Sequence, residues 1–281
     1  MKKYIQIFGI LLLTGFSFFY TEKVTKIVRN KDPIMIRIKS IKKDKYIETI
    51  KPIINNDEYI MGINGCEIDI EKSYNKMKKT GEFKNELLVM KEIDNDKKIK
   101  NKYVISGNKL QKNISLIFLI RNKEDEKLIN YLSYKKIKTN FFIDQNYLEK
   151  NSVIVKFLSK DNNIYYLGNN GIYDDKYMTY ARNLIEINSN NEFDYCLVDK
   201  KDDITLKLCT QYNMKTIKTN FIKDNILQNI KQNLENGSII VIDSSYNENI
   251  KTSINYILSK GYNIVTLDKL LNNNSKCKEF E

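Results

Sequence analysis

The fold is decided by the stretch Lys138-Thr139-Asn140-Phe141-Phe142-Ile143, in which polar residues lead into a run of aromatic and β-branched side chains. Short apolar runs bounded by polar residues are typical of buried strands. Two later stretches have the same character, Gly237-Ser238-Ile239-Ile240-Val241-Ile242 and Lys260-Gly261-Tyr262-Asn263-Ile264-Val265-Thr266-Leu267. Together they predict that the C-terminal part of the chain is built around buried strands.

A regular alternation of strands and helices extends outward from these stretches. Seven strand candidates occupy residues 114–120, 139–143, 163–167, 193–198, 214–218, 238–242 and 263–267. Helical patterns fill the intervals, at residues 124–135, 147–159, 175–187, 202–212, 225–233 and 249–260. Gly261 follows the last helix directly, where a left-handed cap is expected.

This alternation predicts an α/β fold with right-handed crossovers and a mostly parallel sheet. The pattern alone fits two architectures, an open doubly wound sheet and a β/α barrel, and leaves both open. In either case functional side chains gather at the C-terminal ends of the strands.

The three stretches resemble, in order, the K-A-T-F-F-V, G-S-I-I-L-L and K-G-Y-x-F-V-T-L strands of polysaccharide deacetylases, the NodB-homology domain of carbohydrate esterase family four. The resemblance covers about residues 113–271. It implies that residues 113–272 form a distorted seven-stranded β/α barrel of the deacetylase type. In that family an aspartate and two histidines hold a divalent metal, a second aspartate is the base, and a late histidine is the acid.

The first catalytic motif of the family, T-F-D-D-G, corresponds here to Ile117-Phe118-Leu119-Ile120-Arg121. The base aspartate is therefore replaced by Leu119, and the metal-binding aspartate by Ile120. The family's R-x-P-Y segment aligns with about residues 196–199, where its arginine and proline are missing.

The three histidine positions of the family are also replaced. The metal-binding pair follows a Gly-Asn dipeptide, which places Asn170 and Asp174 at the two histidines, and Asp243 stands at the acid histidine. The whole chain has no histidine, which excludes imidazole-based nucleophile pairs and metal sites. We therefore expect no catalytic residue, no bound metal and no other cofactor. A hard-cation site built by Asp174 and Asp243 is the alternative, but two carboxylates fall short of the six to eight oxygens that Ca²⁺ takes.

The N-terminus has the layout of an export signal, with Lys2 and Lys3 before an apolar segment at residues 4–20. No small-x-small cleavage site follows. Residues 1–23 are therefore predicted to be an uncleaved anchor in the cell membrane, with the N-terminus inside and the remainder on the extracytoplasmic side. A cleaved signal and a secreted protein are the alternative.

Residues 24–112 form a charged region with short apolar runs and a predicted helix at residues 71–79. We expect a small α+β region of unknown role, and residues 273–281 form a polar tail. The cysteines Cys66, Cys196, Cys209 and Cys277 show no C-x-x-C spacing and allow three full pairings, among which the sequence does not choose.

The net charge of +12 is spread along the chain, and no motif indicates nucleic acid. Attraction to anionic lipid or cell-wall polymer fits this balance. The resulting hypothesis is a pseudoenzyme that binds cell-wall glycan or a partner protein. Tyr165, Tyr166 and Tyr173 are candidates for stacking on sugar rings, with simple packing as the alternative. The competing functions are a residual hydrolase acting on N-acetyl groups and a purely structural role that positions residues 24–112.

Overall fold

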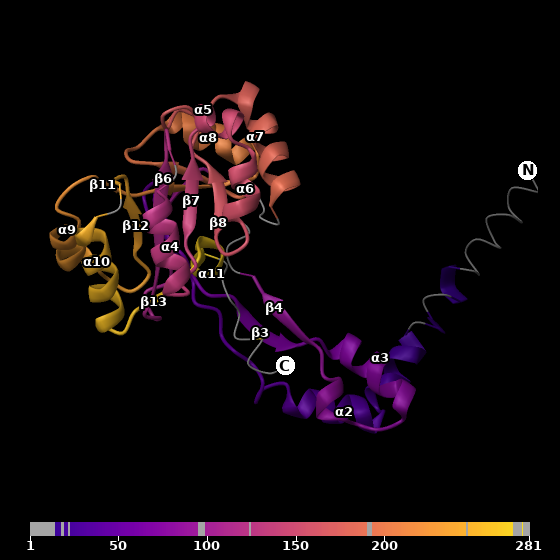
Figure 1. Ribbon diagram of the computed structural model, residues 1–281. Helices are drawn as coiled ribbons and strands as arrows, with labels where there is room; N and C mark the ends of the chain where they lie inside the picture. The colour runs from indigo at the N-terminus through magenta and orange to yellow at the C-terminus, as the bar shows by residue number, and fades with distance from the viewer. Residues whose placement is uncertain are drawn as a thin grey trace, which may run out of the picture. The chain divides into compact units, whose positions relative to one another are not determined.

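The computed structural model describes residues 15–17, 20–21, 23–94, 99–123, 125–189, 193–245, 247–271 and 277. The chain divides into two compact units. The small unit comprises residues 1–48, 65–93 and 275–281, and the large unit comprises residues 49–64 and 94–274 (Figure 1). Residues 49–64 and 94–112, which the sequence analysis grouped with the N-terminal region, thus belong to the large unit.

Most of the predicted apolar anchor at residues 4–20 lies outside the described residues. In the described part of the chain, no helix has both the length and the apolar character needed to cross a membrane.

The first sheet of the large unit contains the strands that carry the deacetylase-like stretches. Its strand order is β11-β12-β6-β7-β8, and β13 pairs with β6. All of these pairings are parallel; Ile117 of β6, for example, lies opposite Asn140 of β7 and Val241 of β12. The bounds are β6 (Asn113–Ile120), β7 (Asn140–Ile143), β8 (Asn163–Tyr166), β11 (Phe221–Ile222), β12 (Ile239–Ile242) and β13 (Asn263–Ile264).

The second sheet combines strands from distant parts of the chain in the order β1-β2-β5-β10-β9. Its strands are β1 (Ile53–Asn55), β2 (Glu58–Ile60), β5 (Tyr103–Ser106), β9 (Tyr195–Val198) and β10 (Lys215–Lys218). The predicted α/β class and six of the seven predicted strands are confirmed; the seventh, predicted at residues 263–267, is shortened to β13 because the helix α11 (Leu267–Leu271) begins at Leu267. The two sheets do not close into one barrel. Among the described residues, β8 and β9 form no ladder, and β10 pairs with β5 instead of with β12.

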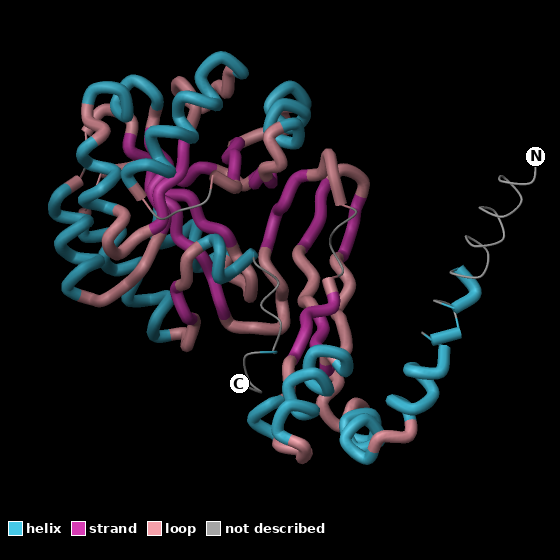
Figure 2. Tube along the Cα trace, turned by 90° about the vertical axis from the view of Figure 1, so that its right-hand side faces the viewer, coloured by secondary structure: helices cyan, strands magenta, loops and turns pink. Residues whose placement is uncertain are grey.

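Most helices of the large unit lie around its strands (Figure 2), whereas the last one, α11, packs in the cluster shared by the two sheets. The helices of this unit are α4 (Glu126–Tyr134), α5 (Gln145–Lys150), α6 (Val153–Leu158), α7 (Asp175–Asn188), α8 (Asp203–Gln211), α9 (Ile226–Asn233), α10 (Glu248–Ser259) and α11 (Leu267–Leu271). The predicted helix at residues 147–159 is divided into α5 and α6. Gly261 has the expected left-handed conformation after α10, with φ of +76°.

Two buried apolar clusters hold the strands in place, and successive residues alternate between them. Phe141 belongs to the cluster that includes residues of α4 to α10, whereas Phe142 belongs to the cluster in which strands of both sheets pack against α11. Ile117 and Phe118 of β6 show the same alternation. This is the two-residue period of a strand that is covered on both faces.

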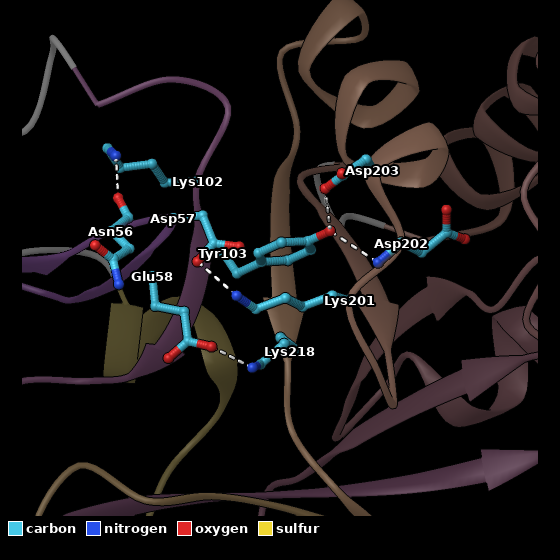
Figure 3. Close-up of polar contacts among 9 residues, drawn as sticks. All are labelled: Asn56, Asp57, Glu58, Lys102, Tyr103, Lys201, Asp202, Asp203 and Lys218. Carbon is cyan, nitrogen blue, oxygen red and sulfur yellow. Dashed lines mark hydrogen bonds and ion pairs between the residues drawn. The ribbon is translucent and has the colours of Figure 1, made fainter.

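Tyr103 is fully buried and fixes β5 beside α8 (Figure 3). Its phenol oxygen accepts a hydrogen bond from the Asp202 backbone N–H at 2.8 Å and donates one to Asp203 Oδ1 at 3.3 Å. Burial raises the pKa of Tyr103 to about 12, because the ionised phenolate would be poorly solvated.

Two ion pairs connect the hairpin of β1 and β2 with β10 and with the segment before α8 (Figure 3). The Lys201 ammonium lies 2.8 Å from Asp57 Oδ1, and Lys218 of β10 forms an ion pair with Glu58 of β2. The hairpin, far from β10 in the sequence, is thereby fixed to the rest of the large unit by side chains as well as by the β2–β5 ladder.

The small unit contains α2 (Pro33–Ile41), α3 (Ile70–Thr80), a short 3₁₀ helix (Asn85–Leu87) and the antiparallel pair β3 (Gly65–Ile68) and β4 (Met90–Ile93). The predicted helix at residues 71–79 is confirmed as α3. The core of the small unit consists of Met35, Ile38, Ile68, Tyr74 and Met77.

Each unit contains one disulfide. Cys66 of β3 is bonded to Cys277 in the small unit, and Cys196 of β9 is bonded to Cys209 of α8 in the large unit. The structure thus selects one of the three pairings that the sequence allowed.

Candidate functional site

The C-terminal ends of β6 and β12 lie side by side, because Phe118 pairs with Ile242. Arg121 follows β6, and Asp243 follows β12. The guanidinium binds the carboxylate with two hydrogen bonds, Nε to Oδ1 at 3.0 Å and Nη2 to Oδ2 at 3.1 Å. The side chains are 28% and 13% exposed, respectively. A two-point, partly buried pair of this kind fixes both groups in one geometry.

This ion pair lines a pocket with a volume of about 270 Å³. Besides the ion pair, Asn122, Lys123, Asp125, Ser244 and Ser245 supply its polar lining. Phe118, Leu119 and Phe141 supply an apolar portion. The pocket therefore offers both hydrogen-bonding groups and an apolar surface at the strand ends, where this fold class places its ligands.

The two aspartate positions of the family have become part of the apolar packing. Ile120 is buried in the cluster that includes the helices, and Leu119 is half-buried against the cluster between the sheets. Neither side chain carries a donor or an acceptor. These positions can neither coordinate a metal nor transfer a proton.

Asn170 lies in the loop after β8 and has a left-handed backbone, with φ of +52°. Its backbone N–H donates to Asp144 Oδ2 at 2.6 Å, and the other oxygen of Asp144 accepts from the Asn146 N–H at 3.0 Å. Asp144 is buried and follows β7 directly. This carboxylate, which the sequence analysis did not single out, holds the loop in place and leaves the Asn170 side chain exposed.

Asp174 is exposed and caps α7, with its Oδ1 accepting a hydrogen bond from the Lys176 N–H at 2.8 Å. Asp243 is bound by Arg121, and among the described residues no hydrogen bond links it to Asp174. The structure thus gathers Leu119, Ile120 and Asp243 at adjacent strand ends, while Asn170 and Asp174 lie in the loop between β8 and α7.

These residues do not fit the metal that the deacetylase fold implies. The five positions hold two hydrocarbon side chains, one amide, one capping carboxylate and one carboxylate that is already bound to a guanidinium. In the part of the chain that the structure describes, no group of three or more Cys, Asp or Glu side chains is placed to hold a metal ion. Such a donor set lacks the strong ligands that a catalytic metal site requires.

The tyrosines considered for sugar stacking are buried, which contradicts that hypothesis and supports packing instead. Tyr165 and Tyr166 are 1% and 0% exposed, and Tyr173 is 5% exposed. Their hydroxyl groups donate internally, from Tyr165 to Asp268 Oδ1 at 3.0 Å and from Tyr166 to Gln145 Oε1 at 2.9 Å. Burial raises the pKa of Tyr165 well above its usual value.

The fold and the strand-end site together define a protein with the fold of carbohydrate esterase family 4 (CE4) deacetylases. The structure of wild-type BA3943, a CE4-family pseudoenzyme from Bacillus anthracis, matches with a TM-score of 0.59 and 19% sequence identity, covering 86% of this chain and 96% of that one. A BA3943 mutant with restored enzymatic activity gives a TM-score of 0.61 at 18% identity, covering 85% and 98% of the two chains. The resemblance to a degenerate deacetylase is therefore confirmed at the level of the fold.

A further similar structure is the Bc1960 peptidoglycan N-acetylglucosamine deacetylase, with a TM-score of 0.52 and 18% identity over 60% of this chain and 92% of that one. In sequence, the chain is 27% identical over 107 residues to the uncharacterized protein YlxY of Bacillus subtilis. That match covers 36% of this chain and 34% of YlxY, so the chain spans about a third of this relative. No protein-family model matches the chain.

Proposed function

We propose that the protein is a catalytically inactive member of the deacetylase fold that binds cell-wall glycan on the outer side of the membrane. The observation that carries the proposal is the Arg121–Asp243 ion pair. It occupies the strand ends at which deacetylases of this fold place their acid, next to base and ligand positions that are now hydrocarbon.

Hydrolysis of an acetamide needs a polarised carbonyl and an activated water, which a bound metal and a general base supply. Leu119 and Ile120 provide neither, and Asp243 is fixed as the counterion of Arg121. The similarity to BA3943, itself a pseudoenzyme, supports the same conclusion.

The pocket at β6 and β12 is the proposed glycan site. Its volume of about 270 Å³ lies below the usual range for drug-sized ligands, which suits a single sugar residue. Serine hydroxyls, the Asn122 amide and the charged pair can bind sugar hydroxyls, and the apolar portion can contact one face of a ring. Similarity to a peptidoglycan deacetylase fold favours an N-acetylated wall polymer as the ligand.

An extracytoplasmic location is supported by the cysteines as well as by the N-terminal segment. All four cysteines form disulfides in the structure. Structural disulfides persist in oxidising compartments and are rare in the reducing cytosol. We propose an uncleaved anchor at residues 4–20, with both units outside the membrane.

Retention of the purified protein on insoluble peptidoglycan, and titration with chitooligosaccharides, tests the glycan site. Ser244→Trp fills the pocket, so we expect it to abolish retention, whereas Ser259→Trp at the exposed end of α10 serves as the matched control and should bind like the wild type. If the wild type is not retained on any wall polymer, a protein partner replaces glycan as the ligand. If Ser244→Trp binds as well as the control, the glycan site lies elsewhere.

A further inference from the structure

We propose that a basic cleft in the small unit binds the phosphodiester headgroup of an anionic membrane lipid. The cleft has a volume of about 890 Å³ and lies wholly within the small unit. It is bordered by the helical residues 21 and 23–30, by α2 and by the segment that joins β3 to α3. It shares no residue with the strand-end pocket of the large unit.

Positive charge dominates the lining of this cleft. Of the described residues, five cationic side chains line it, against two carboxylates, Asp69 and Glu71. The cations come from separate segments of the chain and converge on one cavity, and they are Lys26, Arg29, Lys39, Lys42 and Lys91. Convergence of this kind produces a local positive potential that attracts anions.

The cations differ in how well protein carboxylates neutralise them. Lys42 and Lys91 both bind Glu67, at 2.7 and 2.8 Å, and the two lysines lower the pKa of that carboxyl. In contrast, Lys26 and Lys39 form no ion pair with any carboxylate of the described residues, and Lys39 Nζ donates instead to the neutral Asn30 Oδ1 at 2.7 Å. Among the described residues, these two ammonium groups thus have no carboxylate partner and are available to an anion in the cleft.

Arg29 adds a third positive charge in a less hydrated position. Its guanidinium carbon lies 4.5 Å from the centre of the Tyr74 ring, and the group forms an ion pair with Glu71. Arg29 Nε is buried and has no hydrogen-bond acceptor among the described residues. An anion in the cleft would offset the cost of this incompletely satisfied cation, since charges interact more strongly where water is partly excluded.

The position of the cleft in the chain favours a lipid as the source of the anion. Thr21 lines the cleft and comes directly after the apolar segment at residues 4–20. At a helical rise of about 1.5 Å per residue, Lys26 lies about 9 Å beyond Tyr20. The headgroup layer on each side of a bilayer is about 5–8 Å thick. This step rests on the proposed anchor, and it places the Lys26 backbone at the outer edge of the headgroup layer, from which its long side chain reaches lipid phosphates.

The test measures binding of short-chain phosphatidylglycerol to the full chain in neutral detergent micelles, with short-chain phosphatidylcholine as the zwitterionic control. We expect saturable, one-to-one binding of phosphatidylglycerol alone. Lys26→Gln/Lys39→Gln should weaken it at least tenfold. Lys76→Gln/Lys79→Gln, on exposed α3 positions outside the cleft, should change it less than twofold.

Equal binding of the two lipids, or equal weakening by both double variants, would overturn the proposal. So would a soluble glycerol phosphate oligomer that displaces the lipid at equal phosphate concentration, because the source of the anion would then be a polymer. Whether residues 4–20 are retained is determined separately, from the intact mass of the protein extracted from membranes. A cleaved segment would refute the anchor without altering the micelle result.

Discussion

The strands β6, β7 and β12 and the loops that leave their C-terminal ends are built from contrasting side chains. The strands are packed on both faces and keep apolar residues at the positions typical of a deacetylase. At the strand ends, the expected carboxylates and histidines have become Leu119, Ile120, Asn170, Asp174 and Asp243. The stability of the sheets comes from burial of apolar side chains along the strands, which does not require catalytic residues at the strand ends. Adjacent carboxylates at a metal site are costly to desolvate. Leu119 and Ile120 therefore eliminate the metal-binding and proton-transfer groups of these positions and also the desolvation cost of those groups.

The largest effect is expected inside the strands, at the buried Asn140. Its side-chain amide donates to Leu116 O and Ser115 Oγ, both at 2.8 Å, and its oxygen accepts from the Leu267 N–H at 2.9 Å. Asn140→Ala leaves these buried groups unsatisfied and should lower the free energy of unfolding by about 3 kcal/mol. Urea denaturation measures this free energy. The control Asn146→Ala, at an exposed position of α5, should change it by less than about 0.5 kcal/mol. Equal losses of stability in Asn140→Ala and Asn146→Ala would contradict the claim that the strand interior contributes more to stability than the segments at the strand ends.

Tyr103→Phe should destabilise the protein by about 2 kcal/mol at neutral pH, since the Asp202 N–H loses its acceptor. Folding raises the pKa of Tyr103 from 10 to about 12, so its stabilising effect is full below pH 10 and is lost as the pH rises towards 12. The difference between wild type and variant should therefore shrink over this interval. Denaturation at pH 8 and pH 11.5 tests this, and Tyr134→Phe, at an 81% exposed position, should show no such trend.

The Arg121–Asp243 pair should contribute a coupling free energy of about 1–1.5 kcal/mol, because it is two-point and partly buried. A double-mutant cycle with Arg121→Met and Asp243→Asn measures it. The exposed pair of Lys109 and Glu235, 46% and 63% exposed, is the matched control and should give no more than about 0.5 kcal/mol. A value at Arg121 and Asp243 no larger than the control would mean that the pair does not fix the strand ends.

Asp174→Ala should have the smallest effect, about 0.5–1 kcal/mol, from the lost cap of α7. Asp161→Ala, in an exposed turn, provides the baseline near zero. Both measurements are repeated with added Zn²⁺ and with a chelator. A metal-dependent stability that disappears in Asp174→Ala would identify Asp174 as a ligand and contradict its role as a cap alone.

The sequence predicted the strands and helices of the large unit because their signals are local. Apolar runs such as residues 238–242 and the cap at Gly261 depend on neighbouring residues in the chain. The insertion of β5 beside β10 was not predicted, because it is determined by long-range contacts such as that of Tyr103 with the start of α8. The distorted barrel that the resemblance implied is therefore not confirmed, since the two sheets are not closed.

The replacements at the site were visible in the sequence, but their new partners were not. Arg121 and Asp243 are 122 positions apart, and their pairing follows from the β6–β12 ladder. A signal was present, since each residue directly follows a predicted strand and the carboxyl ends of parallel strands meet at one edge. Asp144, directly after the 139–143 strand, had the same signal.

The most direct test of the central claim is the metal content of the wild-type protein together with acetate release from N-acetylglucosamine oligomers and peptidoglycan. The protein is purified without chelator, supplied with Zn²⁺, Co²⁺ or Mn²⁺, and then desalted. We predict no stoichiometric metal and no acetate above a protein-free control. One tightly bound metal per chain, with acetate release that a chelator abolishes, would contradict the account.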